Sequence, residues 1–279
     1  MLQFSVIIPT CDRNDLLAKC LDCLAPGVQS LDIDHYEVIV SDDSKANTAR
    51  SFVAEQYTWV KWVEGPKRGP AANRNNGARQ ASGGWLIFFD DDCLPSANCL
   101  NSYWEYISES DWLVLEGKVT SKEKIHSPIL TVPFNEYGGN LWSCNFAIKK
   151  KTFVEIGMFD ENYRFPNLED NDLKKRIELK KIEIKFVPNA DVDHPPRRLA
   201  SPKKLARYHE SWLYFHNKFG ERKNLFNLVS TIIRHRVAAI LRCRFSPDSI
   251  IACRNLVVEL FFTFAFYTFP HASNNQKVL

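Results

Sequence analysis

The chain has 279 residues, enough for one large α/β domain with additions or for two small domains. Apolar residues make up 45% and charged residues 25%, which is typical of a globular protein and excludes a largely disordered one. The net charge of +3 is unevenly spread, because residues 201–279 hold 12 Lys and Arg against 4 Asp and Glu. This basic segment predicts an anionic surface as its partner.

The first hundred residues alternate between short apolar runs and segments with helical periodicity. We expect strands at 4–8, 36–40, 59–63 and 86–89, and helices at 12–24, 46–56 and 71–81. Beyond residue 100 the pattern loosens, and we expect strands at 112–115 and 182–187, a helix at 168–179 and a polar loop at 191–198. The alternation predicts an α/β fold with a mainly parallel, doubly wound sheet.

Three consecutive carboxylates, Asp90, Asp91 and Asp92, directly follow one of the expected strands. They would repel one another unless a cation lay between them. Mg²⁺ and Mn²⁺ are held in proteins by one or two carboxylates together with the phosphates of a substrate. The pattern therefore favours a metal–diphosphate site, and a solvated acidic turn is the alternative.

Two other strand ends also carry polar groups, at residues 10–12 and 42–43. Ligands of doubly wound sheets bind outside the carboxyl ends of the strands, so these groups are expected to lie near the three carboxylates. Neither a GxGxxG segment after the first strand nor a GxxxxGK[ST] segment occurs, so dinucleotide and P-loop sites have no support.

Seven short segments in order carry a resemblance to a known family. They are residues 5–10 (SVIIPT), 38–43 (VIVSDD), 74–77 (RNNG), 88–92 (FFDDD), 156–160 (IGMFD), 168–170 (LED) and His194. Together they make residues 1–200 resemble the family 2 glycosyltransferases, which have the GT-A fold. Each segment alone is weak, but seven in the family's order are specific.

The resemblance implies a domain organisation and a chemistry. Residues 1–200 would form a GT-A catalytic domain, with a nucleotide-binding half at 1–100 and an acceptor half at 101–200. Residues 201–279 would be a basic, aromatic and apolar helical extension. The family implies a nucleotide-sugar donor, with a UDP- or dTDP-sugar favoured here, a divalent Mn²⁺ or Mg²⁺ ion, and inversion at the anomeric carbon.

Site residues follow from the resemblance position by position. Thr10 and Asp43 match the contacts to the nucleotide base, within a donor-binding set of Pro9, Thr10, Asp12, Asp42, Asp43, Arg68, Arg74, Asp90 and Asp91. Asp92 and Asp90 match the metal-binding pair. His194 falls where related enzymes place a further metal or diphosphate ligand, and a histidine packed in a loop is the alternative.

Asp170 matches the catalytic base of the family. It is expected in the first turn of a helix, where the helix dipole would lower its pKa and keep it ionised. Plain capping of that helix by Glu169 and Asp170 is the alternative. Glu169, Trp142 and Asn145 are candidate contacts to the acceptor or to the donor sugar, and for Trp142 and Asn145 core and turn positions are the alternative.

The apolar stretch 225–269 is interrupted by arginines in its first part. Its second part, residues 255–269, is shorter than the ~20 residues that span a bilayer, so we expect a basic amphipathic helix pair on an anionic membrane surface. A packed hairpin or a dimer interface is the alternative. The absence of a signal-peptide pattern and the scattered cysteines predict a cytoplasmic location, either free or associated with the inner face of the membrane.

The expected function is inverting, metal-dependent transfer of a sugar to a hydroxyl of a glycan or lipid-linked acceptor, in surface polysaccharide biosynthesis. One alternative is transfer to a polyprenyl phosphate, and another is a non-catalytic scaffold that binds nucleotides or sugars. Nothing in the sequence supports nucleic-acid binding beyond the basic and aromatic residues of the C-terminal region.

Overall fold

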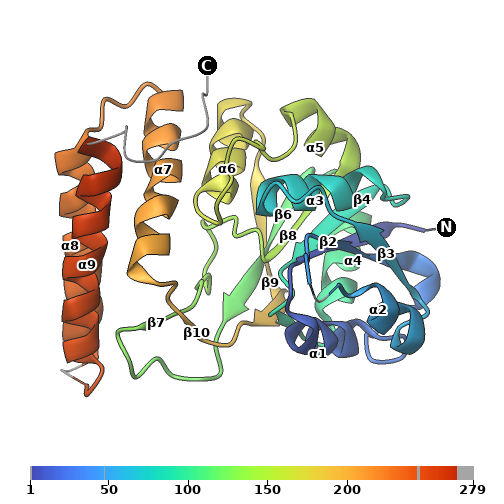
Figure 1. The fold of residues 1–279 in the computed structure, drawn as a ribbon. Coiled ribbons are helices and arrows are strands. Elements are labelled where there is room, and N and C mark those ends of the chain that lie inside the picture. Colours follow the sequence, from blue (N-terminus) through green and yellow to red (C-terminus); the bar gives the residue numbers. More distant parts are fainter. Residues whose placement is uncertain (1, 47, 244–245, 269–279) are drawn as a thin grey trace. The chain divides into compact units, whose positions relative to one another are not determined.

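The computed structural model describes residues 2–46, 48–243 and 246–268, and the chain forms two compact units (Figure 1). The sheet unit comprises Met1–Lys122 and Pro133–Pro195. The helical unit comprises Glu123–Val132 and Pro196–Leu279. The end of the expected C-terminal region, including Phe269, lies outside the described residues.

An eight-stranded sheet with the order β3-β2-β1-β4-β8-β6-β9-β5 forms the centre of the sheet unit. Its strands are β1 Phe4–Thr10, β2 Tyr36–Asp42, β3 Val60–Glu64, β4 Trp85–Phe89, β5 Leu94–Pro95, β6 Val114–Thr120, β8 Asn145–Lys149 and β9 Ile184–Asp193. Strands β8 and β5 run antiparallel to their neighbours and the remaining pairs are parallel. The expected α/β fold with a mainly parallel sheet is confirmed.

Helices cover both faces of this sheet (Figure 1). They are α1 Asn14–Leu24, α2 Arg50–Gln56, α3 Pro70–Arg79, α4 Cys99–Glu109, α5 Lys150–Ile156 and α6 Glu169–Leu179. Both faces of β1 are apolar, because successive side chains of a strand point to opposite faces. Phe4, Val6 and Ile8 belong to the core with α1, α2 and α4. Ile7 points the other way, toward α3. On that second face a cluster of phenylalanines packs α5 against β4 and β8.

Three local expectations were wrong. Helix α1 was expected to begin at residue 12, but it begins at Asn14, and Arg13 at its N-cap position bonds with its side chain to Asp91. The expected helix 46–56 begins only at Arg50, because the carboxylate of Asp42 holds the backbone N–H of Ala49. The expected polar loop 191–198 begins as strand, because residues 191–193 pair with β6.

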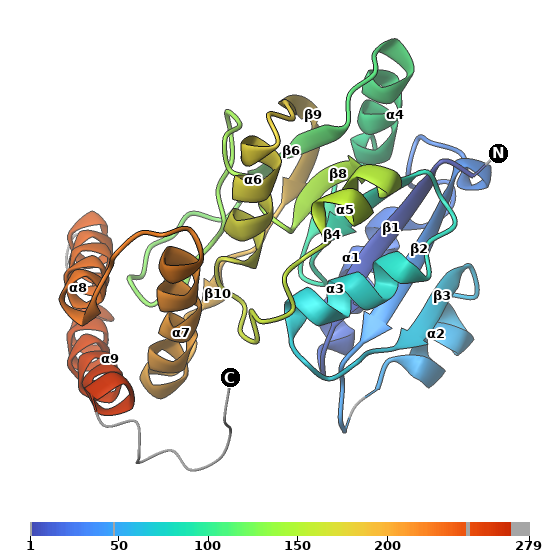
Figure 2. The ribbon, with the colours of Figure 1, turned by 90° about the horizontal axis from the view of Figure 1, so that it is seen from above.

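The helical unit contains a two-stranded antiparallel sheet of β7 Leu130–Thr131 with β10 Arg197–Arg198, and the helices α7 Pro202–Lys218, α8 Leu225–Arg242 and α9 Ser249–Thr268. Figure 2 shows α8 and α9 side by side. Glu259 of α9 is buried and ties the three helices together, because its carboxylate lies 2.9 Å from Nε2 of His209 in α7 and accepts two hydrogen bonds, of 3.0 and 3.1 Å, from Arg236 in α8.

The length of α9 corrects another expectation. The described part of the apolar segment, residues 255–268, belongs to a helix of 20 residues, which is long and apolar enough to cross a bilayer. Length and composition alone are weak grounds for a span, since a core helix can have both.

Gly77 allows α3 to lie against the sheet, and its substitution tests this packing. A Cβ at this position would lie 2.6 Å from Cγ2 of Ile7. We expect Gly77→Ala to lower the free energy of unfolding by about 1–3 kcal/mol through overpacking, as measured by urea denaturation. The control is Gly84→Ala, where a Cβ meets no described atom within 4 Å, and equal stability of the two variants would contradict the close approach.

Candidate functional site

The carboxyl ends of β1, β2 and β4 meet at one edge of the sheet. Thr10, the last residue of β1, lies opposite Asp42, the last residue of β2. The hydroxyl of Thr10 donates a 2.7 Å hydrogen bond to Oδ2 of Asp91, directly after β4. The structure therefore brings together the three strand ends that the sequence analysis singled out.

The three consecutive carboxylates lie beside two arginines. Asp90 lies 2.5 Å from the guanidinium of Arg74. Asp91 and Asp92 both pair with Arg13, in the second case at 3.1 Å. The cationic groups that the cluster required are thus supplied in part by the chain itself.

Arg13 was not found by sequence analysis. It follows Asp12 in the turn after β1, and nothing in its sequence context distinguishes it from a solvated arginine. Its partner Asp91 is fully buried, and burial raises the pKa of that carboxyl to about 7 although Arg13 opposes the rise. Asp91 therefore serves as an internal anchor for the turn after β1.

Arg74 connects the carboxylates after β4 with the start of α6. Only 4% of its surface is exposed, and its guanidinium also lies 3.0 Å from Glu169. Burial alone would lower the pKa of Arg74, but Asp90 and Glu169 raise it above its usual value. A buried charge of this kind is held only by its partners, so Arg74 fixes the distance between the two acidic groups.

Asp170 lies in the first turn of α6 and is buried. Its carboxylate accepts a 2.8 Å hydrogen bond from the backbone N–H of Asn171 and a 3.4 Å one from that of Ser143. Burial and the charge of Glu169 raise its pKa to about 7. The expected lowering of this pKa by the helix dipole was wrong, because desolvation outweighs the dipole.

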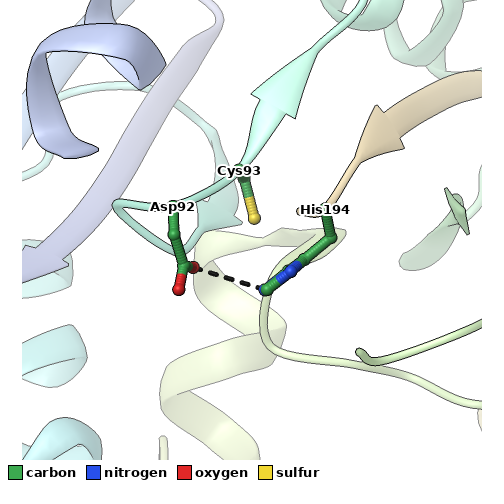
Figure 3. Close-up of side chains that lie close together, drawn as sticks. All are labelled: Asp92, Cys93 and His194. Atoms are coloured by element: carbon green, nitrogen blue, oxygen red, sulfur yellow. Dashed lines mark ion pairs between the residues drawn. The ribbon is translucent and has the colours of Figure 1, made fainter. Parts of the chain in front are cut away.

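Three atoms that could bind a metal lie within 4.8 Å of one another, one each from Asp92, Cys93 and His194 (Figure 3). Nε2 of His194 lies 3.3 Å from Oδ1 of Asp92, and its Nδ1 lies 3.0 Å from the carbonyl oxygen of Pro195. Because a carbonyl only accepts hydrogen bonds, Nδ1 carries a proton and Nε2 faces the carboxylate. Burial lowers the pKa of His194, but Asp92 outweighs it and raises that pKa overall. A proton or a cation fits between these two groups.

The end of β2 is organised by its own two carboxylates. Asp42 accepts hydrogen bonds from the backbone N–H groups of Ser44 and Ala49 and from the indole of Trp62. Asp43 accepts one of 2.7 Å from the backbone N–H of Lys67, and burial raises its pKa. Both side chains therefore shape the loops around this edge.

Three further expected site residues have contacts of their own. Pro9 is buried within β1, and the backbone N–H of Asp12 donates to the hydroxyl of Ser44. Arg68 is exposed and lies 2.6 Å from Glu161, which also pairs with Arg79.

The side chains of Asn145 and Trp142 form hydrogen bonds with other parts of the sheet unit. The amide of the buried Asn145 accepts from Tyr103 and donates to the carbonyls of Lys118 and Ala190, so it joins α4, β6 and β9. The indole of Trp142 is half-buried against the core and donates to the carbonyl of Phe134.

A family model described as glycosyl transferase family 2 matches residues 5–127. The curated GalNAc(5)-diNAcBac-PP-undecaprenol beta-1,3-glucosyltransferase of Campylobacter jejuni is 37% identical over 159 residues, which cover 55% of this chain and 48% of that protein. The poly(ribitol-phosphate) beta-N-acetylglucosaminyltransferase TarS of Staphylococcus aureus is 26% identical over 198 residues, which cover 66% and 31%. The chain thus spans about half the length of the first relative and a third of the second.

Solved structures share the fold. TarS residues 1–349 of S. aureus in complex with UDP gives a TM-score of 0.60 at 16% identity, covering 100% of this chain and 94% of that one. The mannosyltransferase PcManGT from Pyrobaculum calidifontis, in complex with GDP-Man and Mn²⁺, gives 0.57 at 14% identity, covering 96% and 87%. The sheet unit has the expected GT-A fold, and residues 5–127 of this chain are similar to glycosyl transferase family 2.

Proposed function

We propose that this protein is an inverting, metal-dependent glycosyltransferase that moves a sugar from a nucleotide-diphosphate sugar to a hydroxyl of a glycan or lipid-linked acceptor. The observation that carries the proposal is the buried link from Asp90 through Arg74 to Glu169 and Asp170. One end of this link is a group of carboxylates suited to bind a metal–diphosphate. The other end is a carboxyl suited to act as a base.

The donor is proposed to bind at the carboxyl ends of β1, β2 and β4. Thr10 and Asp43 are our candidates for contacts to the base. A UDP- or dTDP-sugar is favoured, which is supported by the UDP and UDP-GlcNAc complexes of TarS, whereas the mannosyltransferase neighbour binds GDP-Man. Arg68 could reach a diphosphate only by leaving Glu161.

Asp92 and His194 are the proposed holders of a Mn²⁺ or Mg²⁺ ion, with Asp90 nearby. Their oxygen and imidazole nitrogen suit such an ion better than the thiol of Cys93 does. When bound, the ion would neutralise the negative charge that develops on the diphosphate leaving group. The chain itself contributes Arg13 and Arg74, which keep the neighbouring carboxylates in place.

Asp170 is the proposed general base. An acceptor hydroxyl must lose its proton as it attacks the anomeric carbon, and a carboxylate within hydrogen-bond reach contributes about 10²–10⁴-fold to the rate. The raised pKa of Asp170, about 7, makes the ionised carboxylate a stronger base than an exposed aspartate. Glu169 is held by Arg74 and is proposed to position Asp170 rather than to take the proton.

Replacing the base tests this assignment. We expect Asp170→Asn to lower kcat for sugar transfer at least 10²-fold, because the amide cannot accept the proton, while the Kd for UDP changes little. Transfer is measured by release of UDP in the presence of acceptor, and UDP binding by calorimetry. Full activity of the variant would overturn the assignment.

The pH profile separates a base from a structural role. A base with a pKa of about 7 is protonated below that pH, so kcat/KM should fall as pH decreases through 7 and level off above it. The residual rate of Asp170→Asn should lack this dependence. A wild-type profile that is flat between pH 5 and 8 would contradict the raised pKa.

The proposed metal site is tested by calorimetric titration of UDP with and without Mn²⁺. Binding should be tighter with Mn²⁺, and His194→Ala should remove most of that enhancement because it deletes a ligand. His126→Ala, at an exposed position in the helical unit, is the matched control. Equal UDP affinity with and without Mn²⁺ in the wild type would count against the metal.

The helical unit is proposed to associate with an anionic membrane surface. Helices α8 and α9 each expose an apolar stripe with the spacing of one helix face: Phe226, Ile233, Val237 and Leu241 on α8, and Ile250, Val257, Phe261 and Phe264 on α9. Arg234, Arg242 and Arg254 are also exposed on these helices. Apolar stripes with arginines suit a surface of anionic lipids.

This association supports a location at the inner face of the membrane and an acceptor in surface polysaccharide synthesis. The Campylobacter relative is named for an undecaprenol-linked acceptor. Transfer to a polyprenyl phosphate remains the second candidate activity, and a scaffold without activity the third. Product analysis distinguishes them, since mild acid frees the added sugar by itself after transfer to a phosphate, whereas after transfer to a hydroxyl the sugar stays linked to its glycan.

Membrane association is tested by flotation with vesicles. The protein should float with vesicles rich in phosphatidylglycerol and less with phosphatidylcholine alone, and added salt should weaken binding. Phe226→Ser combined with Phe261→Ser should abolish flotation, while Phe134→Ser in the sheet unit should not. Unchanged flotation of the double variant would contradict the stripe as the contact.

A further inference from the structure

A pocket of about 310 Å³ opens in the sheet unit beside the second half of α6. Its lining combines two aromatic rings, two carboxylates and one ammonium group, from Tyr137, Phe186, Glu116, Glu178 and Lys174. None of these side chains has a place in the donor, metal or base sites proposed above. We call it the Tyr137 pocket.

The loop that forms one wall is fixed by Glu116. Oε1 of this buried carboxylate accepts a hydrogen bond of 2.9 Å from the amide of Asn135, and others from the backbone N–H groups of Gly139 and Asn140. Gly138 has φ +84°, and a Cβ there would lie 3.0–3.1 Å from Phe186 and Glu116. The loop therefore packs closely on the floor of the pocket, as a pre-formed binding site requires.

Lys174 holds the same loop from α6. Its Nζ donates a 2.6 Å hydrogen bond to the carbonyl of Gly139 and lies 3.4 Å from Oε1 of Glu178. The ring of Tyr137 is 84% exposed on this anchored loop. No described residue donates a hydrogen bond to Oε2 of Glu116, so a ligand in the pocket finds an acceptor there together with an exposed aromatic face.

We propose that the Tyr137 pocket binds one sugar residue of a glycan, at a distance from the reacting hydroxyl. The apolar face of a pyranose packs on aromatic rings, and its hydroxyls donate to carboxylates and accept from an ammonium group. The volume is at the lower end of the ~300–1,000 Å³ of ligand sites, which suits a single ring. Two carboxylates against one ammonium disfavour a nucleotide diphosphate.

The position of the pocket along α6 relates it to the proposed base. At ~1.5 Å per residue, Lys174 and Glu178 lie about 6 and 12 Å from Asp170 along the helix axis. A glycan whose terminal hydroxyl lies at Asp170 can therefore extend along α6 into the pocket. Identifying the ligand as the acceptor rests on the proposed function, whereas sugar binding as such does not.

The test is binding of the full chain to an array of immobilised short oligosaccharides of hexoses and N-acetylhexosamines, with UDP and Mn²⁺ present to fill the donor site. We expect retention of some glycans, with affinity lowered about tenfold by Tyr137→Ala and restored by Tyr137→Phe, which keeps the ring. Phe134→Ala, a half-exposed aromatic of the same segment outside the pocket lining, is the matched control.

The outcomes separate the pocket from the proposed function. Equal glycan binding by Tyr137→Ala and wild type, or no binding to any glycan of the array, overturns the proposed sugar binding in the Tyr137 pocket. Either result leaves the proposed UDP binding and the proposed role of Asp170 unaffected. The protein could instead bind glycans through Tyr137 but neither bind UDP nor transfer sugar. That result supports sugar binding in the Tyr137 pocket and overturns the proposed transferase activity. With an active enzyme, Tyr137→Ala should raise KM for longer acceptors and leave UDP affinity unchanged.

Discussion

The buried guanidinium of Arg74 is the interaction on which the acidic edge of the sheet depends. It lies between Asp90 after β4 and Glu169 at the start of α6, two positions far apart in the sequence. Removing one partner of such a buried pair typically costs about 3–5 kcal/mol, because the other charge is left without compensation. Helix α3, which carries Arg74, therefore sets the positions of both acidic groups at once.

The carboxylates of this edge differ in their surroundings. Asp91 is sealed inside and bonded to Thr10 and Arg13, so it organises the backbone. Asp92 faces the imidazole of His194 at the other side of the same turn. Asp170 is kept from water and is therefore easier to protonate than an exposed aspartate. Differences in burial thus give neighbouring residues of the same type different properties.

Much of the fold was predictable, because alternating apolar runs and segments with helical periodicity are local signals. The mainly parallel sheet and the resemblance to family 2 glycosyltransferases were both expected from residues 1–200; the sheet is confirmed, and the family model matches residues 5–127. The grouping of Thr10 with the carboxylates after β4 followed from sheet topology alone. Whether the proposed site residues have the roles assigned to them remains a prediction.

What the sequence did not reveal depends on contacts between distant residues. Arg13 and Glu116 look like ordinary surface charges until the fold places them, and the raised pKa of Asp170 arises from burial that no local pattern encodes. Asn145 resembled a ligand contact, yet its amide bonds three other elements of the sheet unit. In each of these cases the surroundings of the residue are set by contacts with residues far away in the sequence.

Glu259 has a consequence for how α9 could meet lipid. It is close to the middle of this 20-residue helix, where a charged side chain costs about 2.5–3.5 kcal/mol on insertion into a bilayer. Insertion would also strip the carboxylate of Arg236 and His209. The ion pair thus opposes conversion of the bundle into a transmembrane anchor, and the proposed membrane contact would use the exposed apolar stripes at the level of the lipid headgroups.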